Sequence, residues 1–264
     1  PPRSTLFPYT TLFRSSMSTT YFTRRTIRKY EPRDIDEGLL ERLLKAGTRT
    51  STTGNMQVYS IIVTRDAGMK KRLAPAHFNQ PMVTEAPVLL TFCADFNRFS
   101  KWCRLREAEP GYDNFLSFMT AAIDALLAAQ TVCNAAEEEG LGICYLGTVT
   151  YNADRIIEIL QLPQRVVPVA AVTVGWPAQV PEQPDRLPLD AVVHYETYRD
   201  YAADLIDDLY RAKEAREDNR QFIAENGKKT LAQVFTDVRY KKTDNEYFSG
   251  KFLDVIRKQG FLSR

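Results

Sequence analysis

The sequence predicts an α+β domain followed by a helical C-terminal extension. Short β-branched and apolar runs, which are typical of strands, are scattered between segments whose apolar residues recur at helical spacing. The last third of the chain has few such runs and is rich in charged residues. With 264 residues, the chain is long enough for one large domain or two small ones.

The first predicted elements alternate between helix and strand. Leucines at helical spacing after Pro32 predict a helix over residues 33–47. A β-branched run predicts a strand at 58–64, and the apolar run at 88–95 predicts a second strand. Between these strands, residues 67–73 are expected to form a short helix.

A long helix is predicted over residues 112–139, and its centre is apolar and rich in alanine. Gly140 and Gly142 are expected to end it. Small side chains let backbones approach closely, so this helix is predicted to pack in the core or against another subunit.

Two more strands and one helix complete the predicted domain. Residues 143–146 and 169–174 are expected to be strands, with a helix at 153–160 between them. The second of these strands is almost wholly apolar, which predicts burial on both faces. Four prolines make residues 176–188 an extended loop. From residue 198 the pattern is helical, and a closing amphipathic segment is indicated by Phe252, Leu253, Ile256 and Phe261.

These elements divide the chain into three parts. Residues 1–16 precede Met17, lack the apolar stretch of a signal peptide and do not resemble a native start. We interpret them as a non-native or disordered segment, the alternative being an N-terminal arm that lies on a partner. Residues 17–195 are predicted to form the core, and residues 196–264 the helical extension.

Composition excludes several classes of function. A net charge of +2 argues against nucleic-acid binding. No membrane span is expected, because the most apolar stretch, residues 121–136, contains Asp124, Gln130 and Asn134. No cysteine pair has zinc-binding spacing, and the two histidines are far apart, so no metal site is expected. Free, mostly buried thiols in a reducing cytoplasm are the expected state of the four cysteines.

Four short segments carry polar groups suited to a ligand. Residues 24–28 gather three arginines, whose planar guanidinium groups suit phosphate oxygens, although a solvated basic stretch gives the same pattern. The loop at 51–57 and the amides at 77–80 could hydrogen-bond a polar ring, or could be ordinary turns. Gly147 follows a predicted strand, where a glycine lets a flat ligand approach the backbone or simply ends the strand.

Taken together, these segments resemble the nitroreductase family. The resemblance rests on Arg24-Arg25-Thr26-Ile27-Arg28, Gly54-Asn55-Met56-Gln57, Gln80, Tyr145-Leu146-Gly147-Thr148, Gly175-Trp176-Pro177 and Arg186-Leu187-Pro188, in this order. The last two elements are similar to the branch of flavin reductase P and the oxygen-insensitive NADPH nitroreductases. The resemblance implies a central, mostly antiparallel sheet flanked by helices, and a homodimer with shared active sites.

The resemblance also implies FMN as cofactor and assigns residues to it. The phosphate and ribityl chain would be held by Arg24, Arg25, Thr26 and Arg186. The ring would be contacted by Arg28, Thr52, Thr53, Asn55, Gln80, Tyr145, Leu146, Gly147 and Thr148. A cation at Arg28 would stabilise the negative charge that collects at the pyrimidine end of the reduced ring.

The implied reaction is a ping-pong transfer of hydride from NADPH or NADH, through FMN, to a nitroaromatic, quinone or flavin acceptor. Because the cofactor performs the chemistry, no side chain is predicted as nucleophile or general base. Lys228 and Lys229 are weak candidates for the 2′-phosphate of NADPH, the alternative being a solvated loop. Two alternatives keep the flavin but change the reaction, to reductive dehalogenation or flavin destruction. Two others are a flavin-binding sensor without turnover and a cofactor-free dimer.

Overall fold

A computed structural model describes residues 20–262 of the chain. The predicted non-native segment at residues 1–16 therefore lies outside the described residues. Four strands form one sheet in the order β1-β2-β4-β3, and every neighbouring pair is antiparallel. The strands are β1 (Tyr59–Thr64), β2 (Val88–Asp95), β3 (Gly142–Leu146) and β4 (Val166–Gly175).

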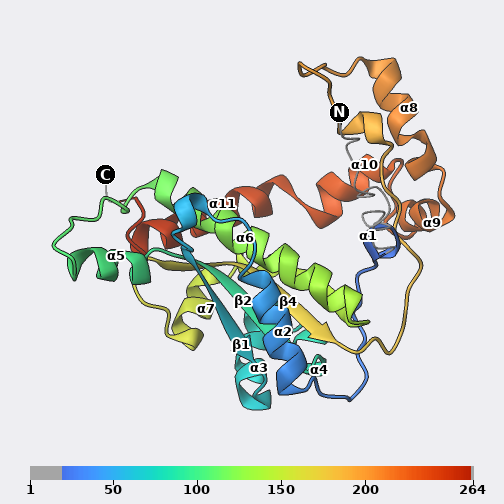
Figure 1. Cartoon of the computed structure of the whole chain (residues 1–264). Helices are drawn as coiled ribbons and strands as arrows, with labels where there is room; N and C mark the ends of the chain where they lie inside the picture. The colour runs from blue at the N-terminus through green and yellow to red at the C-terminus, as the bar shows by residue number, and fades with distance from the viewer. Residues whose placement is uncertain (1–19, 263–264) are drawn as a thin grey trace, which may run out of the picture.

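Helices cover both faces of this sheet, which gives three layers (Figure 1). On one face lie α2 (Glu37–Gly47) and α6 (Phe115–Glu138). On the other face lie α3 (Ala67–Leu73), α4 (Met82–Glu85) and α7 (Ala153–Leu160). The two central strands are sandwiched between these layers, which explains why β2 is buried along its whole length.

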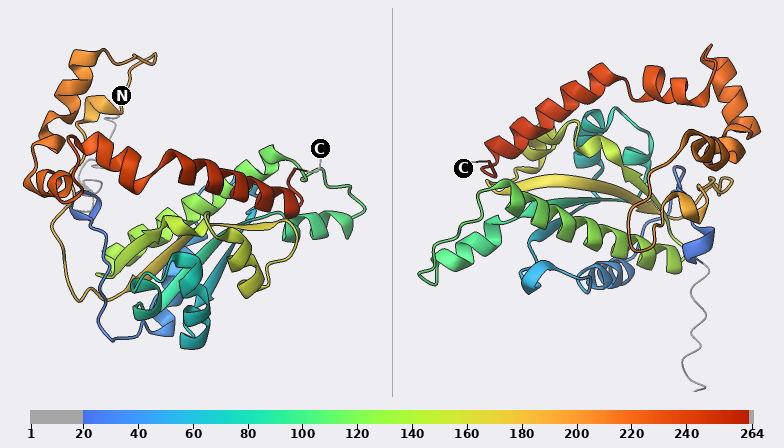
Figure 2. Two further views of the ribbon diagram at one scale, coloured as in Figure 1. Left: turned by 180° about the vertical axis from the view of Figure 1, so that it is seen from behind. Right: turned by 90° about the horizontal axis from the view of Figure 1, so that it is seen from above.

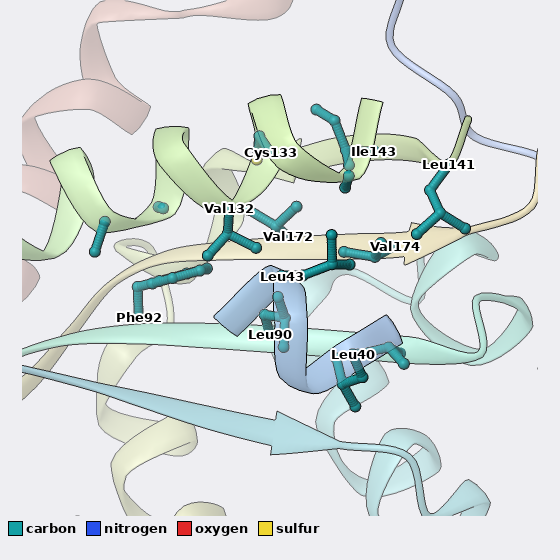
Figure 3. Packing of buried hydrophobic residues seen from close by; sticks show 14 of the residues in the cluster. Leu40, Leu43, Leu90, Phe92, Val132, Cys133, Leu141, Ile143, Val172 and Val174 are labelled. Atoms are coloured by element: carbon teal, nitrogen blue, oxygen red, sulfur yellow. The ribbon is translucent and has the colours of Figure 1, made fainter. Parts of the chain in front are cut away.

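The main core lies between the sheet and the α2–α6 layer. Figure 3 shows Leu43 of α2 and Val132 of α6 close to Leu90 and Val172 of the central strands, with which they form one core cluster. Each fully buried side chain of this kind stabilises the fold by about 1.5–3 kcal/mol. The small residues of α6 face inward, and Gly47 approaches α6 so closely that an added Cβ would lie 2.4 Å from Val132.

By length and composition, α6 could cross a membrane, contrary to the expectation from sequence. Half of its most apolar window is buried inside the structure, where it packs on β2 and β4. The carboxylate of Asp124 is also buried and accepts hydrogen bonds from a neighbouring loop. These contacts identify α6 as the core helix of a folded domain.

The C-terminal part of the chain first leaves the core and then returns to it (Figure 2). Helices α8 (Ala203–Glu214), α9 (Glu217–Glu225) and α10 (Leu231–Val234) form an arm at one end of the molecule. Helix α11 (Lys242–Lys258) runs from the arm back across the core. Beyond it, Phe261 is completely buried and contacts Phe118 of α6 edge to face.

The remaining elements are short. They are α1 (Thr20–Thr23), α5 (Asn97–Arg104), the 3₁₀ turns η1 (Thr53–Asn55), η2 (Ala74–His77), η3 (Gly147–Val149) and η4 (Leu189–Ala191), and the π turn η5 (Phe235–Arg239). The sequence had indicated no helix at α5.

Four predicted boundaries were wrong for local reasons. The helix predicted from residue 33 begins at Glu37, because the Asp36 side chain caps it by accepting from the Leu39 N–H at 2.9 Å. Asn114 likewise caps α6 and delays its start to Phe115. The strand predicted from residue 169 begins at Val166, since Pro168 is accommodated at a β-bulge. Gly142, expected to end α6, instead opens β3.

Candidate functional site

The N-terminal segment, residues 24–28, lies along the outer edge of β3. Ile27 donates its N–H to the Ile143 carbonyl at 2.9 Å, and Thr26 forms a parallel bridge with Ile143. This approach requires Gly142, because a Cβ there would lie 2.5 Å from the Ile27 side chain. We call this junction, together with the outer edge of β3 as far as Thr148, the β3 seam. It brings the arginine segment beside the strand that leads to Gly147.

Of the two leading arginines, one is paired and the other has an unused donor. Arg24 Nε lies 3.4 Å from Glu137 Oε2, and the Glu137 side chain is mostly buried at the end of α6. Arg25 Nε is buried and has no hydrogen-bond partner among the described residues. Both arginines line a hollow of about 170 Å³, which Pro177 and Val180 of the proline-rich loop also border. Arg25 is therefore the better placed to bind an anion.

Open backbone and unpaired polar atoms mark the other end of the β3 seam. Gly147 is exposed, and a Cβ added there would meet nothing within 4 Å. Beside it, Thr148 Oγ1 and His77 Nδ1 are joined by a 2.8 Å hydrogen bond. Gln80 Oε1 is buried without a partner among the described residues. These orphaned atoms and the open glycine fit a polar, flat group such as a flavin at this edge.

The seam is elongated along β3. Five residues separate Ile143 from Thr148, which is at most about 17 Å of extended chain. Arg24, Arg25 and Thr26 lie toward its Ile143 end, and Gln80, Gly147 and Thr148 lie toward the other end. The structure thus joins predicted residues from three distant parts of the sequence. Tyr145 and Leu146 belong to β3 itself, with Tyr145 exposed and Leu146 buried.

The thiols and the phenol beside the arginines are held neutral. Burial raises the pKa of Cys133 to about 12, and it raises the pKa of Tyr145 as well. Burial also raises the pKa of Cys144, although the positive charge of Arg28 partly opposes this shift. All four cysteines are buried thiols, as the sequence predicted. Cys133 and Cys144 are thus not expected to form a thiolate nucleophile near neutral pH.

The predicted ring loop of residues 52–55 is held elsewhere in the same subunit. Asp124 of α6 accepts hydrogen bonds from Thr52 Oγ1 at 2.5 Å and from the Thr53 N–H at 3.0 Å. Asp124 and Glu137 are 13 residues apart on α6, which is about 20 Å at the helical rise. One copy of the chain therefore separates Thr52 and Thr53 from Arg24. Asn55 is exposed on this loop.

The late cations are found on the loop and the arm. Arg186 is exposed on the proline-rich loop, where it donates to the Asp185 carbonyl at 2.8 Å. Lys228 forms an ion pair with Asp237 at 3.0 Å, and the Lys229 N–H donates to Gln233. The exposed Arg28 lies near Cys144 on the seam.

Two residues at the site were not predicted from sequence. Asp124 was considered there only as a polar interruption of an apolar helix, yet it anchors the 52–55 loop. His77 was grouped with the amides of its loop, although its ring is fully buried and contacts Thr148. Neither pairing has a local sequence signal, because the partners are about 70 residues apart in both cases.

Comparison with known proteins assigns the chain to a family. Residues 21–176, more than half of the chain, match the nitroreductase family. The chain belongs to this family. Among its curated relatives, the FMN reductase (NADPH) of Bacillus subtilis is 35% identical over 181 residues, which cover 68% of this chain and 73% of the relative. The oxygen-insensitive NADPH nitroreductase of Salmonella typhimurium is 29% identical over 91% of this chain and 95% of that enzyme.

The nitroreductase fold extends beyond the family match. A crystal structure of a Bacteroides fragilis protein is 58% identical and covers 93% of this nitroreductase chain and 100% of its own, with a TM-score of 0.92. The similarity therefore includes most of the C-terminal arm and α11. The α+β class, the antiparallel sheet and the helical C-terminal extension predicted from sequence are confirmed.

Proposed function

We propose that the protein is an FMN-dependent NAD(P)H oxidoreductase that reduces nitroaromatic, quinone or flavin acceptors by a ping-pong reaction. One observation carries the proposal: the β3 seam aligns an open glycine with a buried arginine donor and a buried glutamine oxygen, both of which lack a hydrogen-bond partner within residues 20–262. The similar FMN reductase and NADPH nitroreductase support it. When bound, FMN supplies the chemistry by accepting a hydride from the nicotinamide and passing electrons to the acceptor.

The chain's own residues bind and orient the cofactor. Arg25 would hold the phosphate with Thr26, and Arg186 would join them from the proline-rich loop. Arg24 would contribute positive charge while Glu137 fixes its position. At the other end, Gly147 lets the ring approach the backbone, and Gln80 and Thr148 offer polar atoms to its edge. Arg28 would stabilise negative charge on the reduced ring.

We further propose a homodimer, because a second copy is needed to bring Thr52, Thr53 and Asn55 to the seam. Helix α6 also presents an apolar stripe at helical spacing that the monomer leaves exposed. This α6 stripe consists of Leu116, Met119, Ile123, Leu126 and Leu127. A partner α6 would cover the stripe and set the 52–55 loop of one subunit over the seam of the other.

The proposal extends to the electron donor, the cellular location and the domain boundaries of the protein. NADPH or NADH would be the electron donor. Lys229 on the arm would suit a 2′-phosphate better than Lys228, because Lys228 is paired with Asp237. The enzyme works in the cytoplasm, where its buried thiols stay reduced. We retain residues 17–195 as the FMN-binding core and residues 196–264 as the extension.

The phosphate site can be tested with Arg25→Ala. We expect this variant to lose at least about tenfold in FMN affinity, since a charged hydrogen bond contributes roughly 1.5–3 kcal/mol. Flavin content after dialysis and FMN titration of the flavin-free protein measure this loss. The control is Arg42→Ala. Arg42 is an exposed arginine of α2, and it is paired with Glu139 at the end of α6.

The reaction is tested separately by NADPH oxidation with menadione and nitrofurazone under steady state. An enzyme consumes NADPH in many turnovers, whereas a sensor is reduced once. Unchanged FMN retention in Arg25→Ala would refute the phosphate site. A wild-type protein that binds no FMN and oxidises neither NADPH nor NADH would refute the function as a whole.

A further inference from the structure

His77 lies at the base of the β3 seam with its imidazole completely buried. Its Nδ1 atom is 2.8 Å from Thr148 Oγ1, whereas its Nε2 atom is buried without a partner among the described residues. Burial lowers the pKa of the imidazole to about 4, so the ring is neutral near pH 7. A neutral imidazole has one N–H, and the environment decides which nitrogen carries it.

The orphaned nitrogen favours one tautomer. If the proton were on Nε2, a buried N–H would have no acceptor, and such groups are rare in folded proteins. With the proton on Nδ1, the N–H donates to Thr148 Oγ1 and the unpaired atom is a nitrogen lone pair. The Thr148 hydroxyl oxygen then accepts from His77. Its own proton is left to point away from the ring, and Thr148 is itself half-buried beside the open Gly147.

The polypeptide just before His77 is held in place by a side-chain hydrogen bond. Asn152, the N-cap residue of α7, donates to the Ala76 carbonyl at 2.9 Å, and Lys251 of α11 donates to Asn152 at 3.1 Å. After His77, Phe78 and Asn79 both have φ of +54°, a left-handed conformation that costs non-glycine residues energy. Strained residues of this kind persist where surrounding contacts enforce them, and they concentrate at functional sites.

We propose that His77 is a positioning residue: its Nδ1–H fixes the Thr148 hydroxyl as a hydrogen-bond donor toward the flavin edge beside Gly147. This inference rests on the proposed FMN function. A hydroxyl locked as a donor favours a ring edge that accepts a hydrogen bond. It therefore contributes to the reactivity of the bound flavin, while His77 itself contacts no substrate.

The tautomer can be measured without any flavin. The chain has two histidines, so long-range ¹H–¹⁵N spectra of the flavin-free protein contain few imidazole signals, and His194→Asn assigns them. We expect the His77 spectrum at pH 7 to show the proton on Nδ1. A proton on Nε2 would overturn the proposal, whatever the activity of the enzyme.

Variants test the effect on the flavin. In His77→Asn, the amide N–H₂ can replace Nδ1–H, whereas His77→Leu removes the donor and Thr148→Val removes the hydroxyl at nearly constant volume. We expect His77→Leu and Thr148→Val each to slow flavin reduction at saturating NADPH about tenfold and to shift the visible flavin spectrum. The double variant should be no slower than either single one. His77→Asn should recover the wild-type spectrum and most of the rate.

Several outcomes contradict the proposal without touching the proposed function. Additive losses in the double variant, or a His77→Asn variant as slow as His77→Leu, would show that His77 does not act through Thr148. Loss of folding in His77→Leu leaves Thr148→Val and the tautomer as decisive measurements. If FMN binds to no form of the protein, the function fails, and the tautomer still reports on His77.

Discussion

Single buried polar side chains determine the geometry of both halves of the site. Asp124 holds the 52–55 loop, Glu137 holds Arg24, and His77 holds Thr148. Each of these contacts joins a helix or turn of the layers to a segment at the sheet edge. Removing the partner of Asp124 or His77 would leave a buried polar group unsatisfied, which costs about 1–3 kcal/mol. The site is thus set largely before any cofactor arrives.

Stability should depend on pH through His77. Its folded-state pKa is lowered from 6.5 to about 4, so the unfolded chain binds the proton that the folded chain refuses between these values. The free energy of unfolding is therefore not reduced by His77 above pH 6.5. It declines as the pH falls toward 4, by about 3 kcal/mol in total. Urea unfolding at pH 7 and pH 4.5 measures this change. His77→Asn should lose less stability over the interval, whereas His194→Asn should match the wild type; equal declines in all three would contradict the assignment.

Arg28 is expected to affect reactivity more than affinity. It is exposed beside Cys144 on the seam, away from the Arg24–Glu137 pair. Arg28→Ala should lower the rate of flavin reduction about tenfold or more, because a cation at the ring stabilises charge that develops on reduction. FMN affinity should fall less. Stopped-flow reduction and FMN titration give the two values, with the adjacent exposed Lys29→Ala as control; equal losses of rate and affinity would argue against a role at the ring.

At the scale of elements, the β3 seam depends on a glycine. Gly142→Ala would place a Cβ 2.5 Å from Ile27 and force residues 24–28 away from the strand. Overpacking of this kind costs about 1–3 kcal/mol, and here it also displaces the arginines. We expect FMN affinity to fall at least fivefold in addition to the loss of stability.

A matched variant separates these two effects. Gly47→Ala produces a comparable clash, 2.4 Å from Val132, but in the core between α2 and α6. Calorimetry and FMN titration should show similar destabilisation of both variants and loss of FMN affinity in Gly142→Ala alone. Equal FMN affinities in the two variants would mean that the seam does not position the cofactor segment.

Elements with a strong local signal were predicted well from the sequence. The helices at Ala67–Leu73 and Ala153–Leu160 and the strand at Val88–Asp95 have the predicted bounds, because apolar periodicity and flanking turns define them. The start of β4 was missed, since proline argues against a central strand unless a bulge is foreseen. The pairing order of the strands and the seam were not predicted, because contacts between distant residues leave no periodicity in the chain. The family resemblance implied only a mostly antiparallel sheet and the residues assigned to FMN.

At the scale of the whole molecule, a dimer is the main expectation. Ile123 lies in the middle of the α6 stripe and is about half exposed in the single chain. Ile123→Glu would put a charge into the proposed interface, where an unpaired buried charge is strongly unfavourable. We expect a monomer by light scattering, with little FMN retained. Leu105→Glu, at an exposed leucine just after α5, should remain dimeric; a monomeric wild type would remove the shared site.

The seating of Phe261 against Phe118 has a consequence for synthesis in the cell. The apolar surface around Phe118, near the start of α6, stays uncovered by Phe261 until translation has passed residue 261. At about 5–20 residues per second, this leaves an apolar surface exposed on the ribosome for roughly 7–30 s. Nascent chains of this enzyme should therefore bind ribosome-associated chaperones. If translation stalls before α11, the nascent chains should be prone to aggregation.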